Sequence, residues 1–213
     1  ELADAARAGR VRQSAMALTF AHLGAALQLD RLFETDAAIT RLREVIASAP
    51  AAPAGAMARA RLQLGDALSR MGSQAESEAE YRAVIATRPG IGSLAARARD
   101  GLRARPSSAQ TTAYRVSLQG WRAFERGDLN TAAPLIAQSV ALRPDDAVFR
   151  YREARLLLAQ RDDAAAAASL SRVLRTRPDL APAIYAAACV EFATLAERQG
   201  DRGRAIEHYR KAE

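Results

Sequence analysis

The chain has 213 residues, of which 49% are hydrophobic and 26% charged, a balance typical of a folded soluble protein with one or two domains. Its single cysteine and two histidines exclude an internal disulfide and a zinc site built from His and Cys ligands. No apolar run approaches the length needed to cross a bilayer, so no membrane span is expected.

The net charge of +7 comes almost entirely from arginine, since Lys211 is the only lysine. An arginine excess is one signature of proteins that bind nucleic acid or other polyanions. Here the positive charges are spread along the chain and interleaved with Asp and Glu, whereas a nucleic-acid arm more often shows a basic block. Nucleic acid is therefore the less favoured partner. The Arg and Ala bias also fits a GC-rich bacterial genome, and it does not distinguish cytoplasm from periplasm or cell envelope.

Helical patterns follow one another along the chain in pairs, each pair separated by a short turn. No sustained period-2 run predicts a strand, and alanine, the commonest residue, is the best helix former. The sequence therefore predicts an all-α fold. In chain order, the two-helix patterns occupy residues 17–50, 58–91, 113–146, 147–180 and 186–213.

Prolines and glycines recur at regular intervals at the ends of these helical patterns. Pro144 and Pro178 each end a similar run and lie 34 residues apart. Proline stops a helix because it cannot donate the helical hydrogen bond. Glycine in the turn permits a left-handed C-cap, and the Ser or Asp that follows can cap the next helix. Such turns lie at residues 71–73, 126–128 and 199–201.

This repeated helix-turn-helix resembles the tetratricopeptide repeat family. In that pattern, small residues occupy positions 8 and 20, a large residue position 24 and proline position 32. The copy that begins at Ala58 carries Gly65, Ser77, Tyr81 and Pro89 in these places. The resemblance implies an α-solenoid, a right-handed superhelix in which the first helix of each hairpin lines the concave surface. A generic alanine-rich helical bundle is the alternative fold.

The first and last copies depart from the family pattern. The first places Gly24 at the close approach of its two helices, and its turn near residues 31–36 is about two residues longer than the family's. The last copy starts five residues late, at Ala186, so a longer helix is expected before it.

Two segments between the second and third copies fall outside the repeats. Residues 93–105 are predicted to form a capping or connecting helix, with Ser93 as its N-cap and Leu94, Ala98 and Leu102 on one face. Residues 106–112 have the composition of a linker. We therefore expect an N-terminal sub-stack of residues 1–105 and a C-terminal sub-stack of residues 113–213.

The family resemblance implies a binding surface on the first helices of the C-terminal sub-stack. Trp, Tyr and Arg dominate binding hot spots, and this surface holds the only tryptophan. We hypothesise a peptide groove centred on Trp121, Tyr151 and Arg155, in which Arg155 binds a ligand carboxylate. The alternative is that Trp121 packs in the core, because a one-residue rotation of its helix buries it. The full candidate set is Tyr114, Ser117, Trp121, Phe124, Tyr151, Arg155 and Leu158.

The corresponding surface of the N-terminal sub-stack is expected to be less apolar. Only Leu62 is a sizeable apolar residue in the set Arg59, Leu62, Asp66, Ser69 and Arg70. The chain also lacks the Lys and Asn arrangement with which chaperone-binding members of the family hold a terminal carboxylate.

Apparent catalytic signals have structural explanations. The pairs Asp145–Asp146 and Asp162–Asp163 lie at turns, where aspartate caps a helix. Arg161 occupies the turn position where other copies have glycine, so a left-handed backbone is expected there. No catalytic residue, metal or other cofactor is predicted. The sequence predicts a non-catalytic scaffold for a protein or peptide partner, with a docking region of a larger enzyme as the alternative function. It indicates no oligomeric state.

Overall fold

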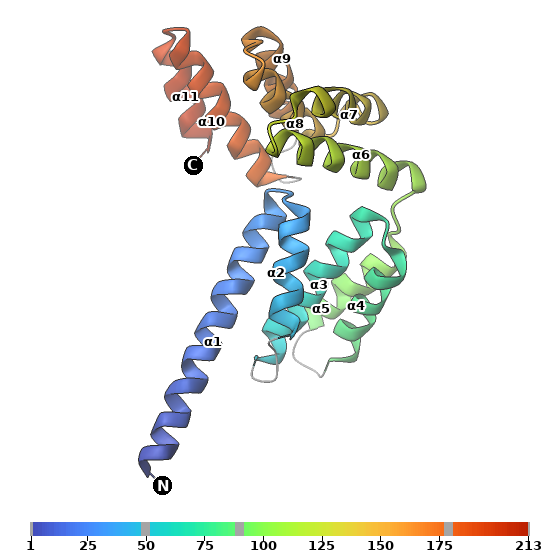
Figure 1. Ribbon diagram of the computed structural model, residues 1–213, viewed down its shortest axis with the longest axis vertical. Helices are drawn as coiled ribbons and strands as arrows, with labels where there is room; N and C mark the ends of the chain where they lie inside the picture. The colour runs from blue at the N-terminus through green and yellow to red at the C-terminus, as the bar shows by residue number, and fades with distance from the viewer. Residues whose placement is uncertain (1, 48–51, 88–91, 177–180, 213) are drawn as a thin grey trace. The chain divides into compact units, whose positions relative to one another are not determined.

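The computed structural model describes residues 2–47, 52–87, 92–176 and 181–212, and every regular element within them is a helix (Figure 1). The chain divides into two compact units, residues 1–108 and 109–213. The boundary between them lies inside the predicted linker of residues 106–112.

The first unit contains two helical hairpins and a fifth helix. Its first helix begins well before residue 17 and is much longer than the others. The elements are α1 (Leu2–Arg31), α2 (Thr35–Ala47), α3 (Ala54–Met71), α4 (Gln74–Ala86) and α5 (Gly92–Arg103). The expected helix after the second hairpin is therefore present, but Ser93 lies inside it and is not its N-cap.

The second unit contains three helical hairpins. The helices are α6 (Ser108–Glu125), α7 (Leu129–Leu142), α8 (Ala147–Ala159), α9 (Asp163–Leu174), α10 (Pro182–Arg198) and α11 (Arg202–Ala212). Because α6 already begins at Ser108, residues 108–112 are helical and the non-helical connection is only residues 104–107. The expectation of a longer helix before the last copy is wrong, because α9 has only 12 residues. It is the first helix of the last copy itself, α10, that is long, and it begins before Ala186 at a proline suited to the first turn of a helix.

The five hairpin turns share one backbone geometry. In the α3–α4 turn, Gly72 has φ 81°, and its N–H and that of Ser73 donate to the Ser69 and Leu68 carbonyls. These two bonds satisfy carbonyls that the helix end would leave unpaired. Gly127 and Gly200 repeat the geometry with φ near 79° and 78°.

Two of these turns are built without glycine. Phe33 has φ 59° and Arg161 has φ 61°, as expected for Arg161 from its place in the turn. The Phe33 N–H donates to the Asp30 carbonyl, and the Glu34 N–H to the Leu29 carbonyl. The first turn is therefore no longer than three of the others, and the expected two-residue insertion is wrong.

Replacing Arg161 with glycine is expected to raise the free energy of unfolding by up to about 1 kcal/mol. The left-handed conformation costs an L-residue roughly 1–2 kcal/mol, and glycine has no such cost. Glycine also increases the conformational entropy of the unfolded chain, which reduces the net stabilisation. Urea denaturation measures the difference. The neighbouring Gln160→Gly serves as a control, because Gln160 has φ −81° and gains nothing from glycine. An unchanged or lower stability of the Arg161→Gly protein would show that this turn carries no strain.

Aspartates cap the helices that follow the turns. The side chains of Asp128, Asp162 and Asp201 each accept a hydrogen bond from the backbone N–H three residues later, at 3.0 Å. Asp146 accepts from two backbone N–H groups of α8. Hydrogen bonds from Thr131 hold the pKa of Asp128 below its ordinary value. Ser73, by contrast, precedes α4 without a side-chain capping bond.

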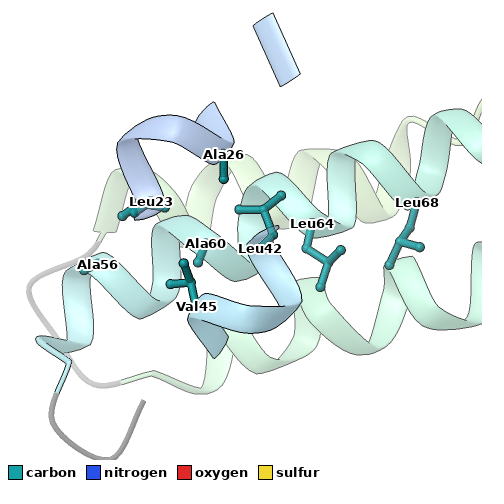
Figure 2. Close-up of a cluster of buried hydrophobic side chains, with 8 residues drawn as sticks. All are labelled: Leu23, Ala26, Leu42, Val45, Ala56, Ala60, Leu64 and Leu68. Atoms are coloured by element: carbon teal, nitrogen blue, oxygen red, sulfur yellow. The ribbon is translucent and has the colours of Figure 1, made fainter. Parts of the chain in front are cut away.

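One core cluster joins the first three helices, as Figure 2 shows, and it corrects the register of the first repeat. Gly24 is exposed, and a Cβ added to it would meet nothing within 4 Å. Ala26 is fully buried in the cluster together with Leu42. Ala26 lies 16 residues before Leu42, the spacing that also separates Gly65 from Tyr81. The close approach is therefore two residues later than predicted, which accounts for the apparent insertion in the turn.

A second cluster surrounds Tyr81 in the first unit. The Tyr81 side chain is 2% exposed and lies against Gly65 of α3 and Gly101 of α5. A Cβ added to Gly65 would be 2.7 Å from the ring, and one added to Gly101 would be 2.6 Å from it. The Tyr81 hydroxyl donates to Asp66 Oδ1 at 2.8 Å. Burial raises the pKa of Tyr81, and it also raises the pKa of Asp66 against the opposing effect of this hydrogen bond.

The second unit repeats this close approach at Gly120. An added Cβ would lie 2.8 Å from Ile136 Cγ1, so only glycine lets α6 and α7 come this near. Ile136 belongs to a buried cluster with Ala123, Ala132 and Leu156. Both units therefore use a glycine on the first helix against a large residue on the second.

Candidate functional site

The structure buries three of the predicted groove residues on α6. Tyr114 and Trp121 are each 7% exposed, and Ser117 is fully buried. The Trp121 ring stacks on Phe124 with a centroid distance of 4.9 Å and an interplanar angle of 20°. The expectation that these positions are exposed is wrong, and the burial favours core packing for Trp121. Phe124 itself is half-buried.

Arg152 of α8, which the sequence pattern did not indicate, is buried against these three residues of α6. Arg152 is 2% exposed, and its Nη1 donates to Ser117 Oγ at 2.9 Å. Its guanidinium carbon lies 5.6 Å from the Trp121 ring centroid and 6.0 Å from that of Tyr114. These distances are within the range of cation–π attraction. Only the neighbouring Tyr151 was predicted to face Trp121, so α8 is rotated by one residue relative to the expectation.

The remaining predicted residues lie on α8. Tyr151, Arg155 and Leu158 are half-buried. Arg155 Nη1 donates to the Tyr151 hydroxyl at 3.2 Å and lies 3.4 Å from Glu191 Oε1 on α10. A ligand carboxylate at Arg155 would have to compete with Glu191, so this arginine is a weaker candidate than the sequence indicated.

The corresponding positions on α3 are mostly engaged within the first unit. Leu62, expected to be exposed, is 1% exposed and packs with Tyr81 and Val84. Asp30 of α1, itself 6% exposed, accepts hydrogen bonds from Gln63 and Arg70. These buried contacts tie α1 to α3 and leave little of that stretch of α3 for a ligand.

An open cavity of about 310 Å³ lies further along the same two helices. It forms where two helical glycines leave space, since a Cβ added to Gly24 or Gly55 would meet nothing within 4 Å. Phe20 lines it and remains 49% exposed, whereas Leu23, another lining residue, is 5% exposed and belongs to the core cluster drawn in Figure 2. The lining residues are Phe20, Leu23, Gly24, Leu27, Gly55, Ala56 and Arg59.

The chemistry of this cavity is that of an apolar pocket with one cation at its edge. Arg59 is exposed, and within the described parts of the chain it has no carboxylate at ion-pair distance. Such a pocket accepts an aliphatic or aromatic side chain, and the guanidinium can bind a nearby carboxylate. The exposure of Arg59 was expected from the sequence, whereas the cavity was not. An exposed glycine between Phe20 and Leu27 on one helix was the signal that pointed to it.

Across residues 2–47, 52–87, 92–176 and 181–212, no group of three or more His, Cys, Asp or Glu side chains is placed to hold a metal ion. Within the same ranges, no helix has both the length and the apolar character needed to span a membrane.

Comparison with known proteins gives two family matches. Residues 58–90 and residues 123–189 each match a tetratricopeptide repeat model. No curated protein matches the chain.

Solved structures with a similar arrangement of helices share little sequence with the chain. YrrB, described as a TPR protein with an unusual peptide-binding site, is 16% identical, with 90% of this chain and 82% of that chain covered and a TM-score of 0.41. The TPR domain of P58(IPK) is 17% identical, with 91% and 59% covered and a TM-score of 0.42. PilF of Pseudomonas aeruginosa is 16% identical, with 92% and 90% covered and a TM-score of 0.40.

The family assignment rests on the repeat models and on the hairpins themselves. One model matches in each unit: residues 58–90 cover most of α3 and all of α4, and residues 123–189 include the complete α8–α9 hairpin. The hairpin turns in both regions contain left-handed residues: Gly72 in the first region, and Gly127 and Arg161 in the two turns of the second region. The chain therefore contains tetratricopeptide repeats, matched over residues 58–90 and 123–189.

Proposed function

We propose that the chain binds a peptide of a partner protein on the first helices of the two hairpins of its first unit, with the main anchor in the α1–α3 cavity. Tetratricopeptide repeats are protein-interaction modules, and the chain is accordingly a protein-interaction scaffold. No reaction is proposed.

The observation that carries this proposal is the cavity between α1 and α3. Its volume, about 310 Å³, is at the lower end of the range for ligand pockets and suits one or two side chains. Burying the exposed ring of Phe20 against a partner's apolar side chain would stabilise a complex by about 25 cal/mol per Å² removed from water. Met16, one helical turn before Phe20, is also exposed and extends the apolar surface along α1.

The position of Arg59 determines the chemistry of the expected peptide. With no carboxylate partner of its own in the described structure, Arg59 favours an acidic residue in the ligand. We therefore expect the ligand to place an apolar side chain in the cavity and an Asp or Glu side chain next to it.

Filling the cavity is expected to abolish peptide binding without harming the fold. Gly24→Leu introduces a side chain into open space and replaces a helical glycine, so the stability should rise by a few tenths of a kcal/mol to about 1 kcal/mol. Peptides selected by the chain from a random display library are then measured by fluorescence anisotropy. Their affinity should fall at least tenfold in Gly24→Leu, which corresponds to about 1.4 kcal/mol.

A matched control is available in the second unit. Gly203 of α11 is also an exposed helical glycine, with only Asp201 Oδ1 within 4 Å of an added Cβ, so Gly203→Leu makes the same change away from the cavity. Binding should stay within about twofold in this variant, and Arg59→Glu should reverse the preference for acidic peptides. Selected peptides that bind Gly24→Leu as tightly as the unchanged chain would contradict the proposal.

A further inference from the structure

The second unit contains a basic cavity remote in sequence from the proposed peptide site. Its volume is about 290 Å³, and it lies where the turn between α7 and α8 meets the C-terminal end of α9. Among the residues that the structure describes, three arginines and one aspartate are its charged lining residues, so the described lining carries mainly positive charge. The described lining residues are Pro144, Asp145, Arg150, Arg172, Arg175 and Thr176.

Arg150 is fixed in place at this cavity. Its side chain is only 12% exposed, its Nε donates to the Pro144 carbonyl at 2.7 Å, and its Nη1 donates to Glu153 Oε2 at 2.9 Å. Glu153 in turn accepts a hydrogen bond from Ser169 Oγ of α9 at 2.7 Å. Arg150 is therefore a preorganised donor whose charge is largely balanced by Glu153.

Arg172 and Arg175 supply the unbalanced charge. Both are exposed, they lie three residues apart at the end of α9, and neither has a carboxylate at ion-pair distance in the described structure. The negative end of the α9 dipole favours cations and accounts for an arginine at this helix end. The dipole does not explain why Arg150, which belongs to α8, lines the same cavity. Like charges that line one cavity repel one another, and a bound anion would offset the repulsion.

We propose that this cavity is a binding site for a phosphate group. The guanidinium groups that line it come from both α8 and the C-terminal end of α9, and together they can donate to more than one oxygen of a phosphate group. Arg172 and Arg175 bring two positive charges to the cavity, which Asp145 offsets in part, and the remaining positive charge favours a phosphate monoester, whose charge at neutral pH is roughly −1.5 to −2. The site is separate from the α1–α3 cavity and lies in the other unit.

Removal of the negative charge of Asp145 is expected to strengthen the binding of phosphate, the opposite of the effect of removing an arginine. The Asp145 carboxylate also lines the cavity and should weaken the binding of an anion. The neighbouring Asp146, not Asp145, accepts the capping bonds of α8, so Asp145→Asn removes the charge without disturbing a cap. This variant should bind phosphate more tightly than the unchanged chain, by about threefold to tenfold.

The test is calorimetric titration of the whole chain, residues 1–213, at constant ionic strength with inorganic phosphate, O-phosphoserine and acetate. Both phosphate compounds should saturate one site, and Arg172→Gln/Arg175→Gln should weaken that binding at least tenfold. The control Arg202→Gln/Arg210→Gln removes the same charge from two exposed α11 arginines and should change the affinity less than twofold. Circular dichroism melting checks that every variant stays folded.

The outcomes separate the possible sources of the phosphate. Saturation by both compounds means that the site accepts a phosphoryl group carried on a larger molecule, whereas saturation by inorganic phosphate alone identifies the free ion as the ligand. The proposal is overturned if neither compound saturates, if acetate binds as tightly as phosphate, or if the α11 control weakens binding as much as the cavity variant does.

Discussion

Replacing Trp121 with alanine is expected to lower the free energy of unfolding by about 3–5 kcal/mol, the usual cost of deleting a buried aromatic side chain. Trp121 is 7% exposed, stacks on Phe124 and lies under the Arg152 guanidinium. Its removal leaves a cavity and takes a cation–π partner from a buried arginine. Urea denaturation followed by circular dichroism measures the change, because the variant has no tryptophan fluorescence.

Two companion variants show whether the loss comes from burial. Trp121→Phe keeps an aromatic ring beside Arg152 and should cost less than the alanine variant. Leu142→Ala removes a side chain that is 50% exposed and should cost less than about 1 kcal/mol. An alanine variant of Trp121 with unchanged stability and lost peptide binding would instead place this residue in a binding groove.

Adding a methyl group at Gly65 or Gly101 is expected to lower the free energy of unfolding by about 2 kcal/mol at each site. The new Cβ would lie 2.7 Å from Tyr81 Cε1 in one variant and 2.6 Å from Tyr81 Cζ in the other. The ring has no room to withdraw, because it is 2% exposed and its hydroxyl is bound to Asp66. Overpacking of this kind costs about 1–3 kcal/mol and outweighs the gain of about 1 kcal/mol from replacing a helical glycine.

Thermal and urea denaturation of Gly65→Ala, Gly101→Ala and the control Gly55→Ala measure this effect. Gly55 has open space around it and should gain stability from the same change. The penalty at Gly65 should also shrink when Tyr81 is replaced by leucine, because the clash is specific to the ring. A Gly65→Ala protein as stable as the Gly55→Ala protein would mean that α3 and α4 are not packed this closely.

The features that local sequence predicts well are the helices and their turns. A glycine followed by Ser or Asp marks three of the five hairpin turns within a few residues, because these residues act on their own backbone. The other two turns lack glycine. The left-handed conformation of Arg161 follows from its place in the turn, whereas nothing in the side chain of Phe33 predicts its left-handed conformation. Because the first turn was expected to be two residues longer, the register of the first repeat was predicted two positions too early, and Gly24 was assigned the place that Ala26 occupies.

The candidate sites were harder to predict because they depend on how helices rotate against one another. One residue along a helix turns a side chain by about 100°, so a small error exchanges Tyr151 for the buried Arg152. The α1–α3 cavity depends on missing side chains at Gly24 and Gly55, which are far apart in the sequence. The basic cavity likewise joins Arg150 to Arg172 and Arg175 through the packing of α8 and α9.

The most direct test of the proposed scaffold function is hydrogen–deuterium exchange of the whole chain with and without a peptide selected for binding. Protection on binding should appear in residues 20–27 of α1 and residues 55–59 of α3, which line the α1–α3 cavity, and it should be absent in Gly24→Leu. Protection that spares both segments, or that persists in Gly24→Leu, would contradict a peptide site at this cavity.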